Sequence, residues 1–172
     1  MKPYHQVPIV ECGEPLLPIP RHIFAIEQPH PYEKLGAPYD ARSPYFLRQG
    51  VLEHLLTAQA ALSKRFPGWK IQIFDAYRPI AVQQFMVDYT LNEVAQAAGQ
   101  SIDSLSPAEQ QVLREQVYQF WAVPSRNPLT PPPHSTGAAI DVHDSLSHSF
   151  QIVPFLRSDR IEKIAIAVGA LV

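Results

Sequence analysis

Apolar residues recur with the spacing of an α-helix in the segment that begins near Gln49. Residues three, four and seven positions apart lie on one face of a helix, so the pattern predicts an amphipathic helix with one buried face. Pro67 and Gly68 follow directly and are typical of a helix end. The positions of the apolar stripe are Val51, Leu52, Leu55, Leu56, Leu62 and Phe66.

The next two segments predict a strand and then a second helix. Residues 69–74 read Trp-Lys-Ile-Gln-Ile-Phe, an alternating and β-branched pattern that is typical of a strand. Pro79 suits the first turn of a helix, because a backbone N–H at that position has no partner within the helix in any case. The apolar positions that continue this helix are Ala81, Val82, Phe85 and Met86.

Two further segments carry the capping-box pattern, in which Ser or Thr is followed three positions later by Glu. They are residues 90–93, Thr-Leu-Asn-Glu, and residues 106–109, Ser-Pro-Ala-Glu. The second one opens a predicted helix with a buried stripe of helical spacing. That stripe is formed by Leu113, Val117, Phe120 and Trp121.

Proline is unusually frequent and is concentrated near the N-terminus. Of the 172 residues 18 are proline, about twice the usual share, and nine of them lie in the first 44 positions. Proline removes a backbone donor and favours extended geometry in the preceding residue. We therefore expect residues 1–44 to form an extended arm with short strands, such as residues 23–26, ordered against a core. Disorder is the alternative, but the aromatic residues in and next to the arm favour ordering.

A second proline cluster precedes the C-terminal third of the chain. Five prolines between Pro124 and Pro133 predict a non-helical connection into residues 134–137, followed by a short strand over residues 138–142. Helices and strands mix without regular βαβ alternation, which favours an α+β fold with a small antiparallel sheet flanked by helices. The length suits a single domain, which we place over residues 1–172, with residues 143–172 as a divergent tail.

Composition excludes several classes of protein. Fourteen basic against 16 acidic residues leave a net charge of −2, so the sequence predicts no binding to nucleic acid or to an anionic membrane. Cys12 is the only cysteine, which excludes an internal disulfide and cysteine-rich zinc modules. The first residues contain no signal-peptide core, and residues 164–172 form an apolar run too short to span a bilayer. We expect a cytoplasmic protein.

The first segment that could carry chemistry is the end of the predicted strand, Phe-Asp-Ala-Tyr-Arg-Pro over residues 74–79. Turns between a strand and a helix often present functional side chains at the end of a sheet. Arg78 offers a fixed fork of donors that suits a carboxylate or a developing oxyanion. The alternative is a surface arginine that is paired with Asp75.

The second such segment is His-Ser-Thr-Gly-Ala-Ala-Ile-Asp over residues 134–141. Imidazole nitrogen and carboxylate oxygen are both normal zinc ligands. A spacing of seven would place His134 and Asp141 on opposite faces of a straight strand, but Gly137 allows a bend that brings them to one side. The alternative is that Asp141 caps a turn and that His134 lies in a loop without a role.

Together the two segments resemble the signature motifs of the D-alanyl-D-alanine dipeptidases, zinc enzymes of the vancomycin-resistance type. The residues that carry the resemblance are Asp75-Ala76-Tyr77-Arg78-Pro79 and the segment from His134 to Asp141. Residues 45–48, Tyr-Phe-Leu-Arg, and the leucine-rich helix after them are similar as well. The resemblance covers roughly residues 20–142. It implies a fold shared with zinc D,D-carboxypeptidases and the hedgehog signalling domain.

The resemblance also implies a set of functional residues. His134 and Asp141 would be two of three zinc ligands, and Arg78 would stabilise the tetrahedral transition state of peptide hydrolysis. The implied cofactor is Zn²⁺ and the implied substrate is the small dipeptide D-alanyl-D-alanine, in peptidoglycan precursor metabolism. These roles agree with zinc as a Lewis acid and with a cation next to an oxygen that gains charge.

The C-terminal part of the chain departs from the family. The family has a general-base Glu and a third ligand His three residues apart, in a Glu-Trp-Trp-His-like segment. After Asp141, no Glu is followed three positions later by His. A truncated or frame-shifted product is one explanation, and a divergent member that rebuilt its site is the other. In a rebuilt site, His143 could replace the missing ligand and Glu162 the missing base.

We therefore expect His134 and Asp141 to lie close enough to share a metal ion. We expect D-alanyl-D-alanine to be hydrolysed poorly or not at all, because a positioned general base typically contributes about 10²–10⁴-fold to the rate. Two rival functions remain. One is a related zinc D,D-carboxypeptidase, and the other is an inactive module that binds small carboxylates through Arg78.

Overall fold

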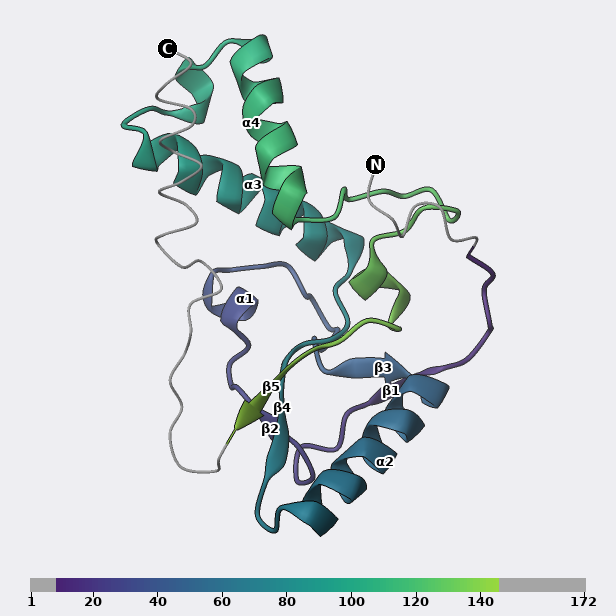
Figure 1. Ribbon diagram of the computed structural model, residues 1–172. Coiled ribbons are helices and arrows are strands. Elements are labelled where there is room, and N and C mark those ends of the chain that lie inside the picture. Colours follow the sequence, from purple (N-terminus) through teal and green to yellow (C-terminus); the bar gives the residue numbers. More distant parts are fainter. Residues whose placement is uncertain (1–8, 146–172) are drawn as a thin grey trace. The chain divides into compact units, whose positions relative to one another are not determined.

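The computed structural model describes residues 9–145 of the chain, in short strands, helices and 3₁₀ turns (Figure 1). The elements in chain order are β1 (Leu16–Pro18), β2 (Ala25–Ile26), α1 (Pro31–Lys34), β3 (Phe46–Arg48), α2 (Gln49–Arg65), β4 (Lys70–Asp75), α3 (Ile80–Ala97), η2 (Ile102–Ser104), α4 (Pro107–Phe120), η3 (Pro133–Thr136) and β5 (Asp141–Ser145). None of the helices in this part of the chain is long and apolar enough to cross a membrane.

The chain divides into two compact units. Within the described residues, the first unit comprises residues 9–83 and 124–145, and the second comprises residues 84–123. The first unit holds the described strands, α1, α2 and η3, whereas the second holds most of α3 together with η2 and α4. Two compact units are compatible with one domain or with two, so the single domain over residues 1–172 stays a prediction.

The first unit contains two small sheets, and this confirms the α+β class. Strands β1 and β3 form an antiparallel pair, and a three-stranded sheet has the order β2-β4-β5. In the second sheet β4 pairs antiparallel with β5 but parallel with β2, so the sheet is mixed rather than purely antiparallel. A parallel pair needs a long crossover, and α1, β3 and α2 lie between β2 and β4 in the chain.

The core of the first unit joins the proline-rich N-terminal segment to the helix and the sheet. Leu47 of β3 and Ile73 of β4 are fully buried, and Ile19 and Phe24 from the segment before them belong to the same cluster. Leu52 and Leu55 of α2 cover this cluster, as the apolar stripe predicts. The N-terminal segment therefore contributes buried apolar area to the unit that contains the candidate site.

Local signals account well for two of the helices. Helix α2 ends at Arg65, before Pro67 and Gly68, and the positive φ of 86° at Gly68 explains why glycine follows the helix. Helix α4 begins with the predicted capping box. The hydroxyl of Ser106 accepts the N–H of Glu109, and the Glu109 carboxylate accepts the N–H of Ser106 at 2.7 Å.

The capping box at residues 90–93 does not start a helix. These residues lie inside α3, which runs without a break from Ile80 to Ala97. Thr90 is buried, and its hydroxyl accepts the indole N–H of Trp121 at 2.9 Å within the second unit. The threonine is thus used in tertiary packing, and the helical residues before it leave no non-helical N-cap position.

Gly137, directly after η3, is a position where any side chain is expected to destabilise the protein. Its φ is +74°, and a Cβ at this residue would lie 2.2 Å from Cδ2 of Leu16. Gly137→Ala should therefore lower the free energy of unfolding by about 2 kcal/mol or more, through left-handed backbone strain and the contact with Leu16. Urea unfolding measures the loss.

Gly68→Ala is the matched control for this prediction. Gly68 also has a positive φ, 86°, but a Cβ there meets no atom within 4 Å. Its substitution should cost only the backbone strain, and Leu16→Ala should recover part of the loss in Gly137→Ala but none in Gly68→Ala. Equal losses at the two glycines would contradict the close approach of Leu16.

Candidate metal centre

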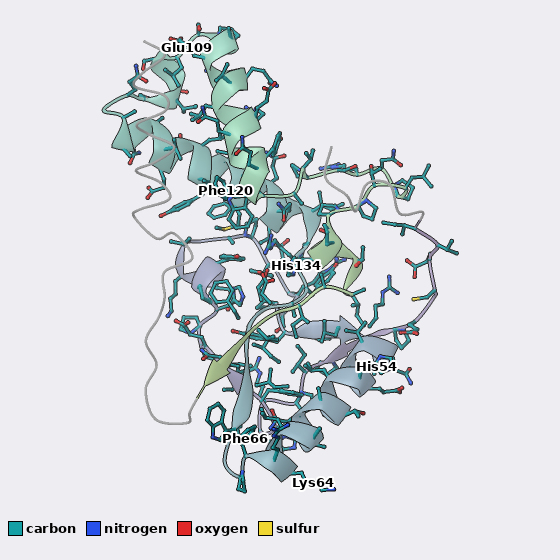
Figure 2. All side chains as sticks on the ribbon, viewed as in Figure 1. His54, Lys64, Phe66, Glu109, Phe120 and His134 are labelled. Carbon is teal, nitrogen blue, oxygen red and sulfur yellow. The ribbon has the colours of Figure 1, made fainter. Side chains whose placement is uncertain are left out.

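The pairing of β4 with β5 brings the two chemically interesting segments together. Asp75 is the last residue of β4, Asp141 is the first residue of β5, and the two are cross-strand partners beside an irregularity in the register. His134 lies in η3, which precedes β5 (Figure 2). The β-bulge and the turn at Gly137 turn the chain so that all three side chains approach one another.

Backbone and hydroxyl hydrogen bonds hold the segment after β4 beside η3. The N–H of Arg78 donates to the carbonyl of His134 at 3.1 Å. The hydroxyl of Ser135 donates to the carbonyl of Arg78 at 2.7 Å. Both bonds join the main chain at Arg78 to residues 134–135, so they fix the backbone positions of Arg78 and His134 relative to each other.

The ring of His134 is oriented by a backbone carbonyl. Its Nδ1 lies 2.9 Å from the carbonyl oxygen of Ala76, which can only accept, so the structure assigns the proton to Nδ1. Nε2 is then left as an unprotonated nitrogen, and it lies 3.5 Å from Oδ2 of Asp141. Metal-binding histidines commonly have this arrangement, with one nitrogen held by a carbonyl and the other free for the ion.

The distance between these two atoms suits a shared ion. Two ligand atoms about 2.1 Å from a tetrahedral zinc ion are roughly 3.4 Å apart. The Asp141 side chain is 44% exposed and the His134 side chain 16%, so the pair is reachable from solvent. The donor types, their separation and their accessibility therefore fit zinc, with two ligands from the described residues.

Asp75 lies next to this pair but is committed to other partners. It is fully buried, and its Oδ2 accepts hydrogen bonds from Nε of Arg78, at 3.1 Å, and from Nη2 of Arg78. Burial raises the pKa of the Asp75 carboxyl, but the charge of Arg78 and the nearby ring of His30 outweigh burial and hold the pKa below its usual range. Asp75 is thus an ionised carboxylate inside the protein.

One ligand atom from each of Asp75, His134 and Asp141 lies within 4.8 Å of the others, so the three form a possible metal-binding group. Asp75 contacts the Nδ1 side of the imidazole at 3.5 Å, whereas Asp141 contacts the Nε2 side. An ion shared by Nε2 and Asp141 is therefore on the other edge of the ring from Asp75. We assign Asp75 to orienting its neighbours.

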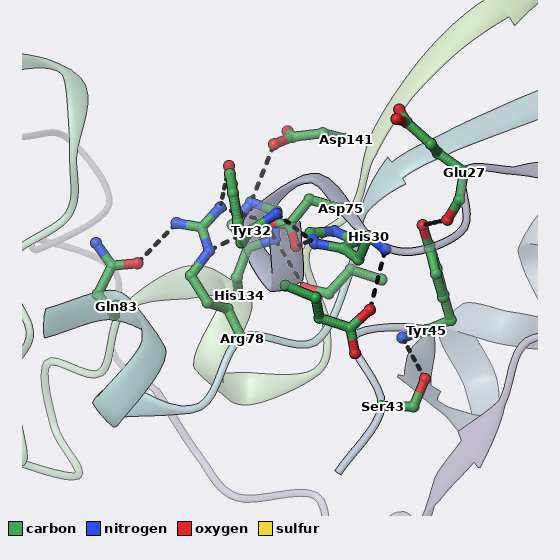
Figure 3. Close-up of polar contacts among 12 residues, drawn as sticks. Glu27, His30, Tyr32, Ser43, Tyr45, Asp75, Arg78, Gln83, His134 and Asp141 are labelled. Carbon is green, nitrogen blue, oxygen red and sulfur yellow. Dashed lines mark hydrogen bonds and ion pairs between the residues drawn. The ribbon is translucent and has the colours of Figure 1, made fainter. Parts of the chain in front are cut away.

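Arg78 is buried rather than placed on the surface. The sequence left open a surface arginine that is paired with Asp75. The pairing is present, but Arg78 is only 5% exposed. Nη1 donates to Oε1 of Gln83 at 2.7 Å, and Nη2 donates to the hydroxyl of Tyr32 at 3.4 Å (Figure 3). Burial lowers the pKa of the guanidinium, but Asp75 more than offsets burial and raises the pKa above its ordinary value.

The structure thus brings Arg78, His134 and Asp141 into one cluster through Asp75. Their catalytic and metal-binding roles stay predictions, and His143 and Glu162 belong to the part of the chain whose side chains the structure does not describe. His30, which lies 3.5 Å from Asp75, is not among the site residues that the sequence motifs indicate. A signal was available, because His30 precedes Pro31 and stands three residues before Glu33, as an N-cap does.

A cavity of about 700 Å³ is lined by sequence neighbours of the site residues but not by the site residues themselves. Tyr77 and Ser135, the neighbours of Arg78 and His134, line this cavity together with Arg42. Nη1 of Arg42 donates to the Tyr77 hydroxyl at 2.8 Å. Tyr77 and Ser135 thus face this cavity, whereas Asp75, His134 and Asp141 do not line it.

Comparison with known proteins identifies the family. The sequence profile described as D-ala-D-ala dipeptidase matches residues 26–153. The chain belongs to this family, which confirms the resemblance, and the match continues beyond Val142 to residue 153.

A curated relative supports the same assignment. The chain is 54% identical over 142 residues to a "D-alanyl-D-alanine dipeptidase" of Synechocystis, over 83% of this chain and 58% of the relative. The chain therefore spans less than two thirds of that protein's length. No solved structure matches this chain.

Proposed function

We propose that this chain contributes to the zinc-dependent hydrolysis of D-alanyl-D-alanine in the metabolism of peptidoglycan precursors. The observation that carries the proposal is the pair of Nε2 of His134 and Oδ2 of Asp141, 3.5 Å apart. Membership of the D-ala-D-ala dipeptidase family supports the substrate class. A cytoplasmic location and a small dipeptide as the partner agree with this function and are part of the proposal.

His134 and Asp141 would hold the zinc ion. When bound, zinc supplies a Lewis acid that polarises a peptide carbonyl and makes water a better nucleophile near neutral pH. The carbonyl of Ala76 keeps the proton of His134 on Nδ1, so that Nε2 stays available as a ligand. The Asp141 side chain is 44% exposed, so a small substrate would approach this ligand from the solvent side.

Arg78 would act on the charge that develops during hydrolysis. A fixed cation in a buried setting stabilises negative charge on a carbonyl oxygen more strongly than it would in water. Asp75 holds the guanidinium through two nitrogens, and Gln83 holds a third. These contacts orient Arg78 in advance, so that little reorganisation is needed during the reaction.

Among the side chains that the structure describes, in residues 9–142, no further His, Cys, Asp or Glu joins the possible metal-binding group. A third ligand and a general base would therefore lie outside these side chains. Without a positioned base the rate falls by about 10²–10⁴-fold. We therefore expect slow hydrolysis, well below the roughly 10 s⁻¹ that is typical of enzymes.

Release of D-alanine by the purified chain, with and without added zinc, tests this function. We expect slow release that depends on zinc and that is abolished by Asp141→Asn, because the amide is a much poorer zinc ligand than the carboxylate. Asp103→Asn, at an exposed aspartate of the second unit, is the matched control and should have no effect. Release that is independent of zinc, or equal in the two variants, would overturn the proposal. Binding of the dipeptide without release would favour the inactive carboxylate-binding module.

A further inference from the structure

His30 is a fully buried histidine that the proposed reaction does not use. It is the N-cap residue of α1, and its exposed fraction is 0%. Its ring makes edge contacts with Tyr32, Tyr39 and Tyr45, with centroids 4.9, 5.7 and 5.3 Å away. A buried imidazole inside an aromatic cage needs a polar partner for each nitrogen.

The cap at α1 determines which nitrogen of His30 carries the proton. The backbone N–H of Tyr32 donates to Nδ1 of His30 at 3.1 Å. A backbone N–H can only donate, so Nδ1 is the acceptor and the proton is on Nε2. Nε2 lies 3.5 Å from Oδ1 of Asp75, and neither atom has a hydrogen-bond partner within normal distance among the described residues.

The two oxygens of Asp75 thus face different partners. Oδ2 accepts hydrogen bonds from Arg78 and lies 3.5 Å from Nδ1 of His134, whereas Oδ1 lies 3.5 Å from Nε2 of His30 (Figure 3). A buried carboxylate oxygen without a donor is costly, and Nε2 of His30, 3.5 Å away and itself without another partner among the described residues, is a donor available to it. Removal of that donor would favour rotation of the Asp75 carboxylate and would weaken its hydrogen bonds with Arg78.

We propose that His30 is a positioning residue for the candidate site, with Nε2–H holding Asp75 so that Asp75 holds Arg78. The consequence for catalysis rests on the proposed dipeptidase function, but the consequence for the orientation of Arg78 does not. These contacts join the N-terminus of α1 to the end of β4. His30 and Asp75 are 45 positions apart in the sequence. The contacts give the proline-rich N-terminal segment a part in the site.

Two substitutions of His30 separate this role from packing and capping. Asparagine places an acceptor where Nδ1 lies and keeps the cap of α1, but it is too short to reach Asp75. Glutamine places its amide N–H₂ near the position of Nε2 and keeps a donor for Asp75, but it caps poorly. A purely structural role predicts that His30→Asn is the milder change, whereas a positioning role predicts that His30→Gln is the milder one for the site.

The first measurements need neither zinc nor activity. Nitrogen NMR of the wild-type chain should show His30 with a bare Nδ1 and a protonated Nε2. The Nε–H signal of Arg78 should exchange slowly in the wild type and in His30→Gln, and it should be lost to fast exchange in His30→Asn. A proton on Nδ1 of His30, or an Arg78 signal retained in His30→Asn, would overturn the proposal. If His30→Asn fails to fold, two results still test the proposal. A proton on Nδ1 of His30 in the wild type, or loss of the Arg78 signal in folded His30→Gln, would overturn it.

Kinetics then test the link to the reaction. With zinc and D-alanyl-D-alanine, His30→Asn should lower kcat by about 10–100-fold with little change in KM, as expected for an outer-shell partner. His30→Gln should retain most of the wild-type kcat. Losses that follow the stability of the variants instead would make His30 merely structural. If the wild type shows no zinc-dependent hydrolysis, the proposed function fails while the NMR result still decides the role of His30.

Discussion

His134→Ala should lower the zinc affinity of the chain by more than 100-fold. The loss exceeds the roughly 10–100-fold that an outer-shell partner contributes, because the substitution removes a ligand itself. Nε2 of His134 is the unprotonated nitrogen 3.5 Å from Asp141, so an ion bound there loses one of its two described ligands. Titration calorimetry or competition with a coloured chelator measures the change.

A second histidine offers a matched control for this measurement. His54 is exposed on α2 and is remote in sequence from the cluster (Figure 2). His54→Ala removes the same side chain from the surface and should leave the zinc affinity unchanged. If both substitutions weaken binding equally, zinc binds to surface imidazoles and the candidate metal centre is wrong.

Arg78→Ala should lower the free energy of unfolding by about 3–5 kcal/mol at neutral pH, the range measured when one partner of a buried ion pair is removed. Asp75 is fully buried, and without Arg78 its charge loses the partner that keeps it ionised. Urea unfolding measures the loss. Arg21→Ala, at an exposed arginine of the same unit, should change the stability by no more than about 0.5 kcal/mol.

Neutralising Asp75 checks the cause of the loss. In the Arg78→Ala background, Asp75→Asn should restore part of the stability, because the buried charge is gone. The pKa of Asp75 is below its usual range in the wild type, so the ion pair contributes fully above a pH of about 4 and less as the pH falls through that lowered pKa. The difference between wild type and Arg78→Ala should therefore narrow in acid. A double variant no more stable than Arg78→Ala would contradict an unpaired charge.

Arg78→Ala also has an expected effect on the proposed reaction. Loss of one donor to a developing oxyanion typically costs about 3–4 kcal/mol of transition-state stabilisation. The effect should appear in kcat with zinc and D-alanyl-D-alanine, after correction for the fraction of folded protein. An unchanged kcat would remove Arg78 from the reaction and leave it as a structural partner of Asp75.

Signals that act within a few residues determined much of the local structure from the sequence. The apolar stripe and the Pro67-Gly68 stop define α2, and the Ser106 capping box defines the start of α4. These features depend on helical spacing and on turn chemistry, which a short window of sequence contains. The motifs around Arg78 and from His134 to Asp141 likewise identify the family without any structure.

Tertiary contacts decided the features that the sequence left open or that it mispredicted. The hydrogen bond from Trp121 gives Thr90 a place inside α3, where the local pattern predicted a helix start. The parallel pairing of β2 with β4 depends on a crossover of more than 40 residues, which no local pattern encodes.

The candidate site shows the same division. The sequence by itself determined which side chains are present, Arg78, His134 and Asp141, and it left their mutual placement open. Only the register of β4 with β5, the turn at Gly137 and the carbonyl of Ala76 decided that Nε2 of His134 faces Asp141. His30 meets Asp75 across a long stretch of chain. The physical reason is that hydrogen bonds and ion pairs between distant segments depend on the path of the backbone, which the pattern of neighbouring residues does not specify.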